Sequence, residues 1–328
     1  MLHTLYGRIA LARRAWYERP GGQRTLGRPV VSVGNLSVGG TGKTPLVAAL
    51  ASWLVASGER PAILSRGYAR RVATRDPVVV SDGTDVLADV ALAGDEPLML
   101  ARAVRGARVV VADDRHQAGV LAETSLDATV HVLDDGFQHV RLARDLDIVV
   151  TPAGALATDA VLPKGRLREP VTALSRASLL VVVGASDAQA EAEARAVGVP
   201  VGLGARRRLG APVVRTGAPP DRRAPLVVMA GIGQPAQFVE GLRADGWIVA
   251  DVCAFRDHHW YTPDDLARVA GRVAATGAWG IATTEKDAVR LGPDAAPSLP
   301  MAVWPLTLEL PRWDVLAAAV GDVLARRG

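Results

Sequence analysis

A glycine-rich segment directly after a short apolar run constrains the fold of this chain more than any other feature. Residues 31–45 read VSVGNLSVGGTGKTP, so an apolar strand leads into a loop that ends in Gly-Lys-Thr. In such a loop the backbone N–H groups wrap phosphates, the lysine supplies positive charge, and the hydroxyl ligates Mg²⁺ at a helix N-terminus. The sequence therefore predicts a nucleoside triphosphate site contacted by the following residues: Ser37, Gly39, Gly40, Thr41, Gly42, Lys43 and Thr44.

The loop departs from the general pattern at one position. G-x-x-x-x-G-K-[ST] requires glycine at position 37, where this chain has Ser37. A strand over residues 29–34 and an alanine- and leucine-rich helix over 43–55 form the context that would confirm the motif. The alternative is a flexible Gly/Ser linker, which would rarely lie between a buried strand and a helix.

Guanine specificity has no support in the sequence. A D-x-x-G motif ending at Gly136 would need aspartate at position 133, where the chain has Leu133. The TEKD segment at 284–287 has the wrong order for the N/T-K-x-D guanine motif. We therefore expect ATP as the nucleotide by default.

The composition bounds the class of protein. With 328 residues, 49% of them hydrophobic, the chain is long enough for two domains with ample cores. Its single cysteine, Cys253, excludes an internal disulfide framework. The net charge of +4 favours anionic partners, but no aromatic residues interleave with the arginine clusters, as a nucleic-acid surface would require. An acidic membrane or a phosphorylated substrate fits better than a nucleic acid, with plain solvated surface as the alternative for each cluster.

Short β-branched runs alternate with helical stretches from residue 21 onwards. This alternation predicts an α/β fold of the P-loop NTPase type, with a mostly parallel sheet and helices on both of its faces. Ligands in such a fold lie at the carboxyl ends of the strands.

A second, smaller α/β domain is expected after a linker. The composition shifts to Gly, Pro and Arg, and residues 210–225 form the expected linker. A final helix is expected from Trp313, after four candidate strands over 226–230, 248–254, 280–283 and 301–308. The expected division is an N-terminal helix over 1–20, a nucleotide-binding domain over 21–209 and the smaller domain over 210–328.

The N-terminal segment has an amphipathic pattern. One helical stripe carries apolar side chains, and the only charged residues before Glu18 are basic: the stripe is Leu2, Leu5, Ile9, Ala12 and Trp16, with Arg8 and Arg14 elsewhere. A helix lying in a membrane interface has this pattern. A helix packed on the sheet with a solvated basic face has it as well, and periodicity does not separate the two. Apolar runs stay below the ~18 to 20 residues of a spanning helix, and no secretory signal is evident, so we expect a protein that stays in the cytoplasm.

Two carboxylates follow an apolar strand expected over residues 128–133. They are Asp134 and Asp135, and the end of such a strand is where a Walker B aspartate of a P-loop protein holds Mg²⁺ or its water shell. The alternative is a turn before Gly136. We expect at least one of the two to serve the metal.

An aspartate opens one expected helix, and two adjacent histidines precede the start of another. Asp95 stands two residues before Pro97, and taken alone this is an ordinary helix cap. His258 and His259 precede a helix start at Thr262, and neighbouring histidines point apart with no third metal ligand evident. A catalytic or structural role for one histidine is therefore favoured over a metal site.

These segments together resemble one family closely, the tetraacyldisaccharide 4'-kinases of lipid A biosynthesis. The resemblance spans nearly the whole chain and rests on residues 37–45, SRGY at 65–68, GDEP at 94–97, residues 113–119, DDGFQH at 134–139, KGRLRE at 164–169, residues 255–258 and TEKD at 284–287. Serine at position 37 looks like the normal form in that family. A basic, apolar N-terminal helix at the membrane surface is also a family feature, which favours the interfacial interpretation of residues 1–20.

The resemblance implies an activity and roles for individual residues. It implies ATP-dependent phosphorylation of the 4'-hydroxyl of a tetraacylated glucosamine disaccharide 1-phosphate, by a peripheral protein at the cytoplasmic face of the bacterial inner membrane. By that similarity Lys43 holds phosphate, Thr44 and Asp135 serve Mg²⁺ with Asp134 beside them, and Asp95 is the base, paired with His258. The same resemblance assigns four residues to substrate binding: Arg66, Arg115, His139 and Glu169.

Two other classes of protein remain as alternatives. One is a nucleotide-driven switch or metallochaperone-type NTPase, which needs partner surfaces and often metal-binding clusters that this chain does not plainly show. The other is a kinase or ligase of a soluble small molecule, which would be active without membranes or detergent. No protein partner is predicted.

Overall fold

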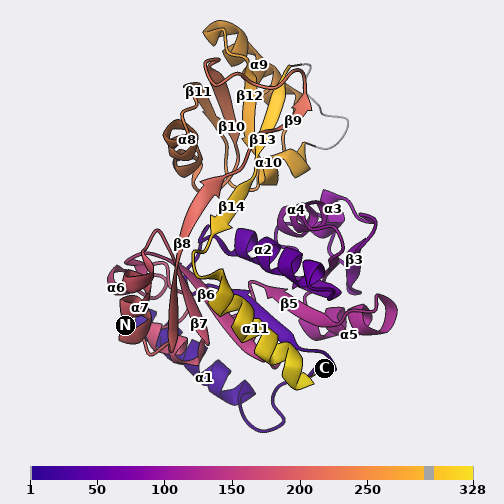
Figure 1. The fold of residues 1–328 in the computed structure, drawn as a ribbon, viewed down its shortest axis with the longest axis vertical. Helices are drawn as coiled ribbons and strands as arrows, with labels where there is room; N and C mark the ends of the chain where they lie inside the picture. Colours follow the sequence, from indigo (N-terminus) through magenta and orange to yellow (C-terminus); the bar gives the residue numbers. More distant parts are fainter. Residues whose placement is uncertain (1, 292–298, 328) are drawn as a thin grey trace.

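The chain forms two lobes, each built on its own β-sheet (Figure 1). The computed structural model describes residues 2–291 and 299–327. The large lobe has nine strands in the order β14-β8-β7-β6-β1-β5-β2-β4-β3, and the small lobe has five in the order β11-β10-β12-β13-β9. The predicted α/β fold with a mostly parallel sheet is confirmed.

The large sheet is parallel except at its two edges, where β3 and β14 run antiparallel to their neighbours. Apolar runs supply its central strands, whose residues are almost all buried because helices cover both faces. Its strands are β1 (Val30–Gly34), β2 (Pro61–Ser65), β3 (Val78–Asp82), β4 (Arg108–Val111), β5 (Val130–Asp134), β6 (Leu146–Pro152), β7 (Leu179–Val183), β8 (Val201–Leu209) and β14 (Leu306–Glu309).

Helix α2 (Lys43–Ala56) follows the phosphate loop and packs its leucines on the sheet. Leu46, Leu50 and Leu54 are fully buried with β1 and β5, which fixes the loop between strand and helix. The strand–loop–helix context expected for the motif is therefore present. The other helices of this lobe are α3 (Val90–Ala93), α4 (Asp95–Ala103), α5 (Arg115–Ser125), α6 (Ala155–Thr158), α7 (Asp187–Ala196) and a 3₁₀ turn, η1 (Val171–Arg176).

The small lobe contains a strand before the first one expected from the sequence, at residues 226–230. The segment expected to be a linker contains strand β9 (Val213–Thr216), which pairs antiparallel with β13 because its β-branched residues extend that sheet. The linker prediction is therefore wrong over these four residues. The remaining elements are β10 (Leu226–Ala230), α8 (Pro235–Ala244), β11 (Val249–Ala254), α9 (Pro263–Thr276), β12 (Gly280–Thr284), α10 (Glu285–Arg290) and β13 (Met301–Trp304).

The C-terminal segment returns to the large lobe (Figure 1). The single strand expected over 301–308 is two strands in different sheets, separated by Pro305, which has no N–H to donate to a ladder. Helix α11 (Trp313–Arg327) then buries Leu316 and Val320 in the core of the large lobe. The expectation that residues 306–327 belong with the small domain is therefore wrong, and β8 and β14 form the antiparallel pair that joins the lobes.

Helix α1 (Leu2–Tyr17) contacts the large lobe through a buried cation, and the described side chains of its apolar stripe are exposed. Arg14 is only 1% exposed, whereas Ile9 is 59% and Trp16 is 55% exposed, and Ala12 is exposed as well. The side chains of Leu2 and Leu5 lie outside the described ones. The alternative is a packed helix with a solvated basic face. It is wrong at Arg14, because this basic side chain is buried while the described stripe residues are exposed. In the described residues no helix combines the length and apolar character needed to cross a membrane.

Candidate active site

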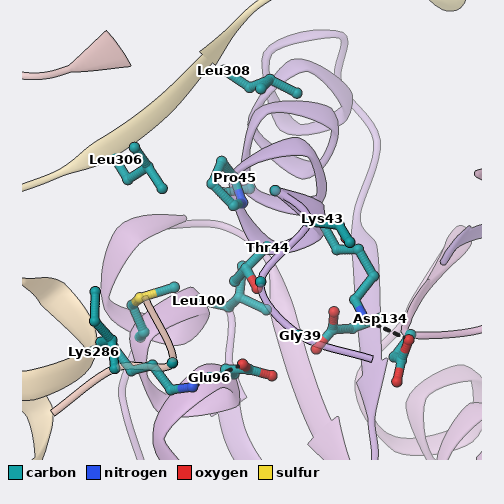
Figure 2. A pocket seen from close by; sticks show the side chains of 18 of the residues that line it. Gly39, Lys43, Thr44, Pro45, Glu96, Leu100, Asp134, Lys286, Leu306 and Leu308 are labelled. Carbon is teal, nitrogen blue, oxygen red and sulfur yellow. Dashed lines mark hydrogen bonds and ion pairs between the residues drawn. The ribbon is translucent and has the colours of Figure 1, made fainter. Parts of the chain in front are cut away.

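A large cavity separates the two lobes at the carboxyl ends of the strands. It measures about 1620 Å³ and is lined by the phosphate loop, by α4 and by residues of the small lobe. Figure 2 shows Lys43 and Asp134 on one side of this cavity and Glu96 beside Lys286 on the other. The cavity therefore brings together chain segments more than two hundred residues apart.

The phosphate loop has the backbone that its glycines permit. Gly39 and Gly42 have φ angles of 106° and 98°, which residues with a side chain rarely adopt. Asn35 braces the loop from within, because its Nδ2 donates to Thr41 Oγ1 at 3.1 Å. Gly39 to Thr44 line the cavity. Ser37 is buried behind the loop, where its backbone forms an isolated antiparallel β-bridge with Leu167. Ser37 is thus placed to support the loop rather than to face the cavity.

Lys43 is held by two acceptors at the base of the loop. Its Nζ donates to Asn35 Oδ1 at 3.0 Å and to Asp135 Oδ1 at 2.6 Å. Arg168 Nη1 donates to the other oxygen of Asp135 at 2.8 Å. Burial opposes ionisation of Asp135, but Lys43 and Arg168 outweigh it and lower its pKa to about 2. Asp135 is therefore an ionised carboxylate in contact with the lysine of the glycine-rich loop.

Asp134 lies deeper, at the end of β5, where it is 2% exposed and accepts from Ser65 Oγ at 3.1 Å. Burial, followed by the negative charge of Glu96, raises the pKa of Asp134 to about 7. A divalent cation would offset the repulsion between these neighbouring carboxylates. Mg²⁺ takes carboxylate oxygens as ligands together with phosphate oxygens. Thr44, Asp134 and Asp135 thus fit a magnesium ion by the chemistry of their oxygen donors.

Asp95 and His258 meet across the cavity, one from each lobe. His258 Nδ1 lies 3.0 Å from Asp95 Oδ2. Arg290 also donates to Asp95 Oδ2, and Lys286 Nζ lies 3.8 Å away. Burial would raise the pKa of Asp95, but the His258 hydrogen bond, Lys286 and Arg290 together lower it well below its usual range. An ionised Asp95 is fixed against the imidazole, as a working acid–base pair requires.

The four residues that the resemblance assigns to substrate binding lie in different surroundings. All four line the cavity, with Arg66 exposed and Arg115 buried. Burial first, and then the charge of Arg115, lowers the pKa of His139 to about 4. Glu169 is already engaged, since both of its carboxylate oxygens accept from the buried Arg14, at 3.0 and 3.2 Å.

Several residues of the site receive no role from the sequence, although Glu96, Arg168 and Lys286 lie in the motif segments named above. Glu96, Lys286 and Arg290 surround Asp95, and Asn35 and Arg168 hold Lys43 and Asp135. Asn35 is a polar residue between an apolar strand and the loop, which is the one local signal of its role. Arg290 carries no such signal, because it lies 195 residues from its partner.

A phosphate loop on one lobe, facing an acid–histidine contact completed by the other lobe, defines a P-loop phosphotransferase. The model of the family described as tetraacyldisaccharide-1-P 4'-kinase matches residues 1–325. The chain therefore belongs to the tetraacyldisaccharide 4'-kinase family, whose members are phosphotransferases with an alcohol acceptor. The resemblance read from the motifs is confirmed.

Individual relatives agree with the family match. The tetraacyldisaccharide 4'-kinase of Geobacter metallireducens is 43% identical over 282 residues, covering 82% of this chain and 80% of the relative. That of Geobacter sulfurreducens is 40% identical over 334 residues, covering 98% and 91%. A solved structure of LpxK from Aquifex aeolicus, an "apo" form in complex with ATP, is 29% identical and has a TM-score of 0.77 over 98% of this chain and 97% of that one.

Proposed function

We propose that the protein transfers the γ-phosphoryl group of ATP to the 4'-hydroxyl of a tetraacylated glucosamine disaccharide 1-phosphate. The observation that carries this proposal is the Asp95–His258 contact in the same cavity as the phosphate loop. Family membership supports the substrate, and the structure of the Aquifex LpxK in complex with ATP supports the nucleotide.

The residues of the cavity divide into two groups by what they do in this reaction. Lys43 and the N–H groups from Gly39 to Thr44 hold the phosphates, and Thr44, Asp134 and Asp135 hold Mg²⁺, which when bound offsets phosphate charge. When the Lys43 ammonium group binds phosphate, its contact with Asp135 must lengthen. Most of the rate enhancement then comes from positioning and electrostatics.

The acid–histidine pair handles the proton of the acceptor hydroxyl. A sugar hydroxyl is a poor nucleophile, so it needs a base within hydrogen-bond reach. Asp95 fixes the Nδ1 side of His258 and stays ionised, so the pair accepts the hydroxyl proton as one unit. Because the pair spans both lobes, closing the lobes completes it.

We further propose that the protein works at the cytoplasmic face of the inner membrane. The exposed side chains of Ile9 and Trp16 support this proposal, because α1 is attached to the large lobe by its opposite side at Arg14. An apolar stripe turned away from the protein is what a helix in a lipid interface presents.

The test is a transfer assay with labelled ATP and a panel of acceptors in detergent. The panel contains the tetraacylated disaccharide 1-phosphate, its deacylated form and simple sugar phosphates. We expect a 4'-phosphorylated product from the acylated acceptor, and its near-complete loss in a folded Lys43→Ala protein. Full activity of Lys43→Ala would contradict the phosphate-loop assignment, and equal transfer to the deacylated acceptor would contradict the lipid substrate.

A further inference from the structure

Arg207 reaches the phosphate loop from the strand that joins the two lobes. It lies on β8, and its Nη2 donates to the carbonyl oxygen of Gly40 at 2.9 Å. Its Nη1 donates to the side chain of Gln237, on α8 of the small lobe. A side-chain carbon at Gly42 would lie 3.9 Å from Nε of Arg207. The guanidinium therefore lies against the middle of the loop.

The charge of Arg207 has no compensation in the described residues. Its contacts there are a carbonyl and an amide oxygen, and its Nε is buried without a hydrogen-bond partner. Burial lowers the pKa of Arg207, with no acidic group acting in the opposite direction. A desolvated cation is costly unless an anion accompanies it. The adjacent loop binds anions, so a bound phosphate would supply the missing charge.

The neighbouring arginines on β8 differ from Arg207. Side chains alternate between the faces of a strand, so Arg206 and Arg208 point to the opposite face. Arg206 is exposed, and Arg208 forms an ion pair with Glu309 at 2.9 Å. Residue 207 is thus the one of the three whose side chain contacts the phosphate loop.

We propose that Arg207 is a catalytic arginine that contacts the β- and γ-phosphates of the bound nucleotide. The proposal rests on the ATP-dependent transfer proposed above. Gly40 stands three residues before Lys43, whose ammonium reaches the same two phosphates in such loops. The Arg207 guanidinium therefore contacts the loop that would hold the phosphates between which the bond breaks.

In the transfer step, the bond between the γ-phosphorus and the bridging oxygen breaks, and its electron pair leaves with ADP. A new bond joins the γ-phosphorus to the 4'-oxygen, whose proton passes to the Asp95–His258 pair. Arg207 offsets the charge that gathers on the bridging oxygen and on the transferring group. An arginine that stabilises the transferring phosphoryl group contributes about 10³ to 10⁵ in rate in other P-loop enzymes.

The test compares Arg207→Ala with Arg206→Ala in the full-length protein. The kcat, the KM for ATP and the melting temperature are measured for both, with Arg207→Ala assayed again in the presence of guanidine. We expect kcat to fall by about 10² or more in Arg207→Ala and by less than about threefold in Arg206→Ala. Guanidine should restore part of the lost rate, because it replaces the missing donor group. The melting temperatures should stay close to that of the wild type.

Nucleotide binding separates this proposal from the identity of the acceptor. A non-hydrolysable ATP analogue should bind Arg207→Ala several-fold more weakly than the wild type, because the variant lacks a phosphate contact. ADP binding should weaken less than analogue binding, because ADP lacks the γ-phosphate. A kcat within threefold of the wild type, an equal loss in Arg206→Ala, or losses that follow the melting temperature would each overturn the role of Arg207. Failure of the wild type to phosphorylate the lipid acceptor, with the two nucleotide affinities as expected, would overturn only the proposed substrate.

Discussion

Asp135 and His258 have φ angles of 55° and 60°, a region that residues other than glycine rarely occupy. Such conformations cost of order 1–3 kcal/mol and persist only where the surroundings hold them. Asp135 is held by Lys43 and Arg168. His258 is held by Asp95 and by its own N–H, which donates to the carbonyl of Gly231 at 3.2 Å. Backbone strain thus occurs at both ends of the proposed reaction, the phosphate end and the proton-accepting end.

Asp95 and His258 should behave as one catalytic unit. We expect Asp95→Ala and His258→Ala each to lower turnover by about 10² or more, the usual scale for a positioned acid–base group. The double variant should be little worse than the worse single one, because both act on the same proton transfer. The measurements are turnover and melting temperature for all three variants. Losses of turnover that multiply in the double variant would show that the two residues do not act as one unit.

His139 should make stability depend on pH in the acid range. Its folded pKa, about 4, is depressed below the unfolded value of about 6.5, chiefly by burial and next by Arg115. The folded state therefore binds fewer protons between these values, and stability present above pH 6.5 is lost as the pH falls towards 4. The melting temperature of His139→Gln should therefore decrease less steeply with falling pH over this window than that of the wild type. Identical slopes would show that His139 does not carry the effect.

At the scale of elements, helix α1 is fastened to the core of the site by one buried cation. Arg14 Nη2 donates to the carbonyl of Phe137 at 2.9 Å, and its guanidinium lies 4.7 Å from the centre of the Phe137 ring. Phe137 follows the two aspartates, and Glu169 follows Arg168, which binds Asp135. The helix proposed to lie in the membrane is therefore linked directly to the segments that carry the proposed metal ligands.

The outward stripe of α1 should matter for membrane binding and not for folding. We expect Ile9→Gln combined with Trp16→Gln to weaken partition into anionic vesicles by at least about tenfold, because both side chains would leave apolar surroundings. Val120→Gln, on the exposed surface of α5, is the matched control and should partition like the wild type. Unchanged partition together with a lowered melting temperature would instead indicate that the stripe packs on protein.

The elements that sequence reasoning places correctly are the ones with local signals. The phosphate loop and α2 follow from glycines and apolar periodicity within fifteen residues, and the helix start at Thr262 follows from its cap with Pro263. The membership of β14 in the large sheet has no such signal, because its partner β8 lies about a hundred residues earlier. The same holds for the contact of Arg14 with Glu169, 155 residues away. Burial and charge pairing over such distances depend on the folded sheet, which no short segment encodes.

At the scale of the whole molecule, the two lobes are joined by ion pairs as well as by chain. Helix α10 packs on α4, and there Arg290 and Asp95 are both nearly fully buried, at 2% and 4% exposure of their side chains. Lys286 adds a second link to the large lobe through Glu96 at 3.3 Å. Breaking a buried ion pair from one side leaves a charge without compensation, which costs about 3–5 kcal/mol.

Arg290→Met should therefore lower the free energy of unfolding by about 3 kcal/mol or more. Adding Asp95→Asn should cost much less than the sum of the two single changes, because the stranded carboxylate is gone. Urea unfolding of the wild type, both single variants and the double variant measures this coupling. Additive losses would show that the two side chains do not stabilise each other.

The return of the chain through β14 and α11 has a consequence for biosynthesis. Leu308, Leu316 and Val320 complete the core around α2, yet they leave the ribosome only after the small lobe. The small lobe, residues 213–304, is continuous and has emerged in full before them. The nucleotide-binding half of the protein therefore keeps an incomplete core until β14 and α11 have been synthesised, whereas the half inserted into it can fold before them.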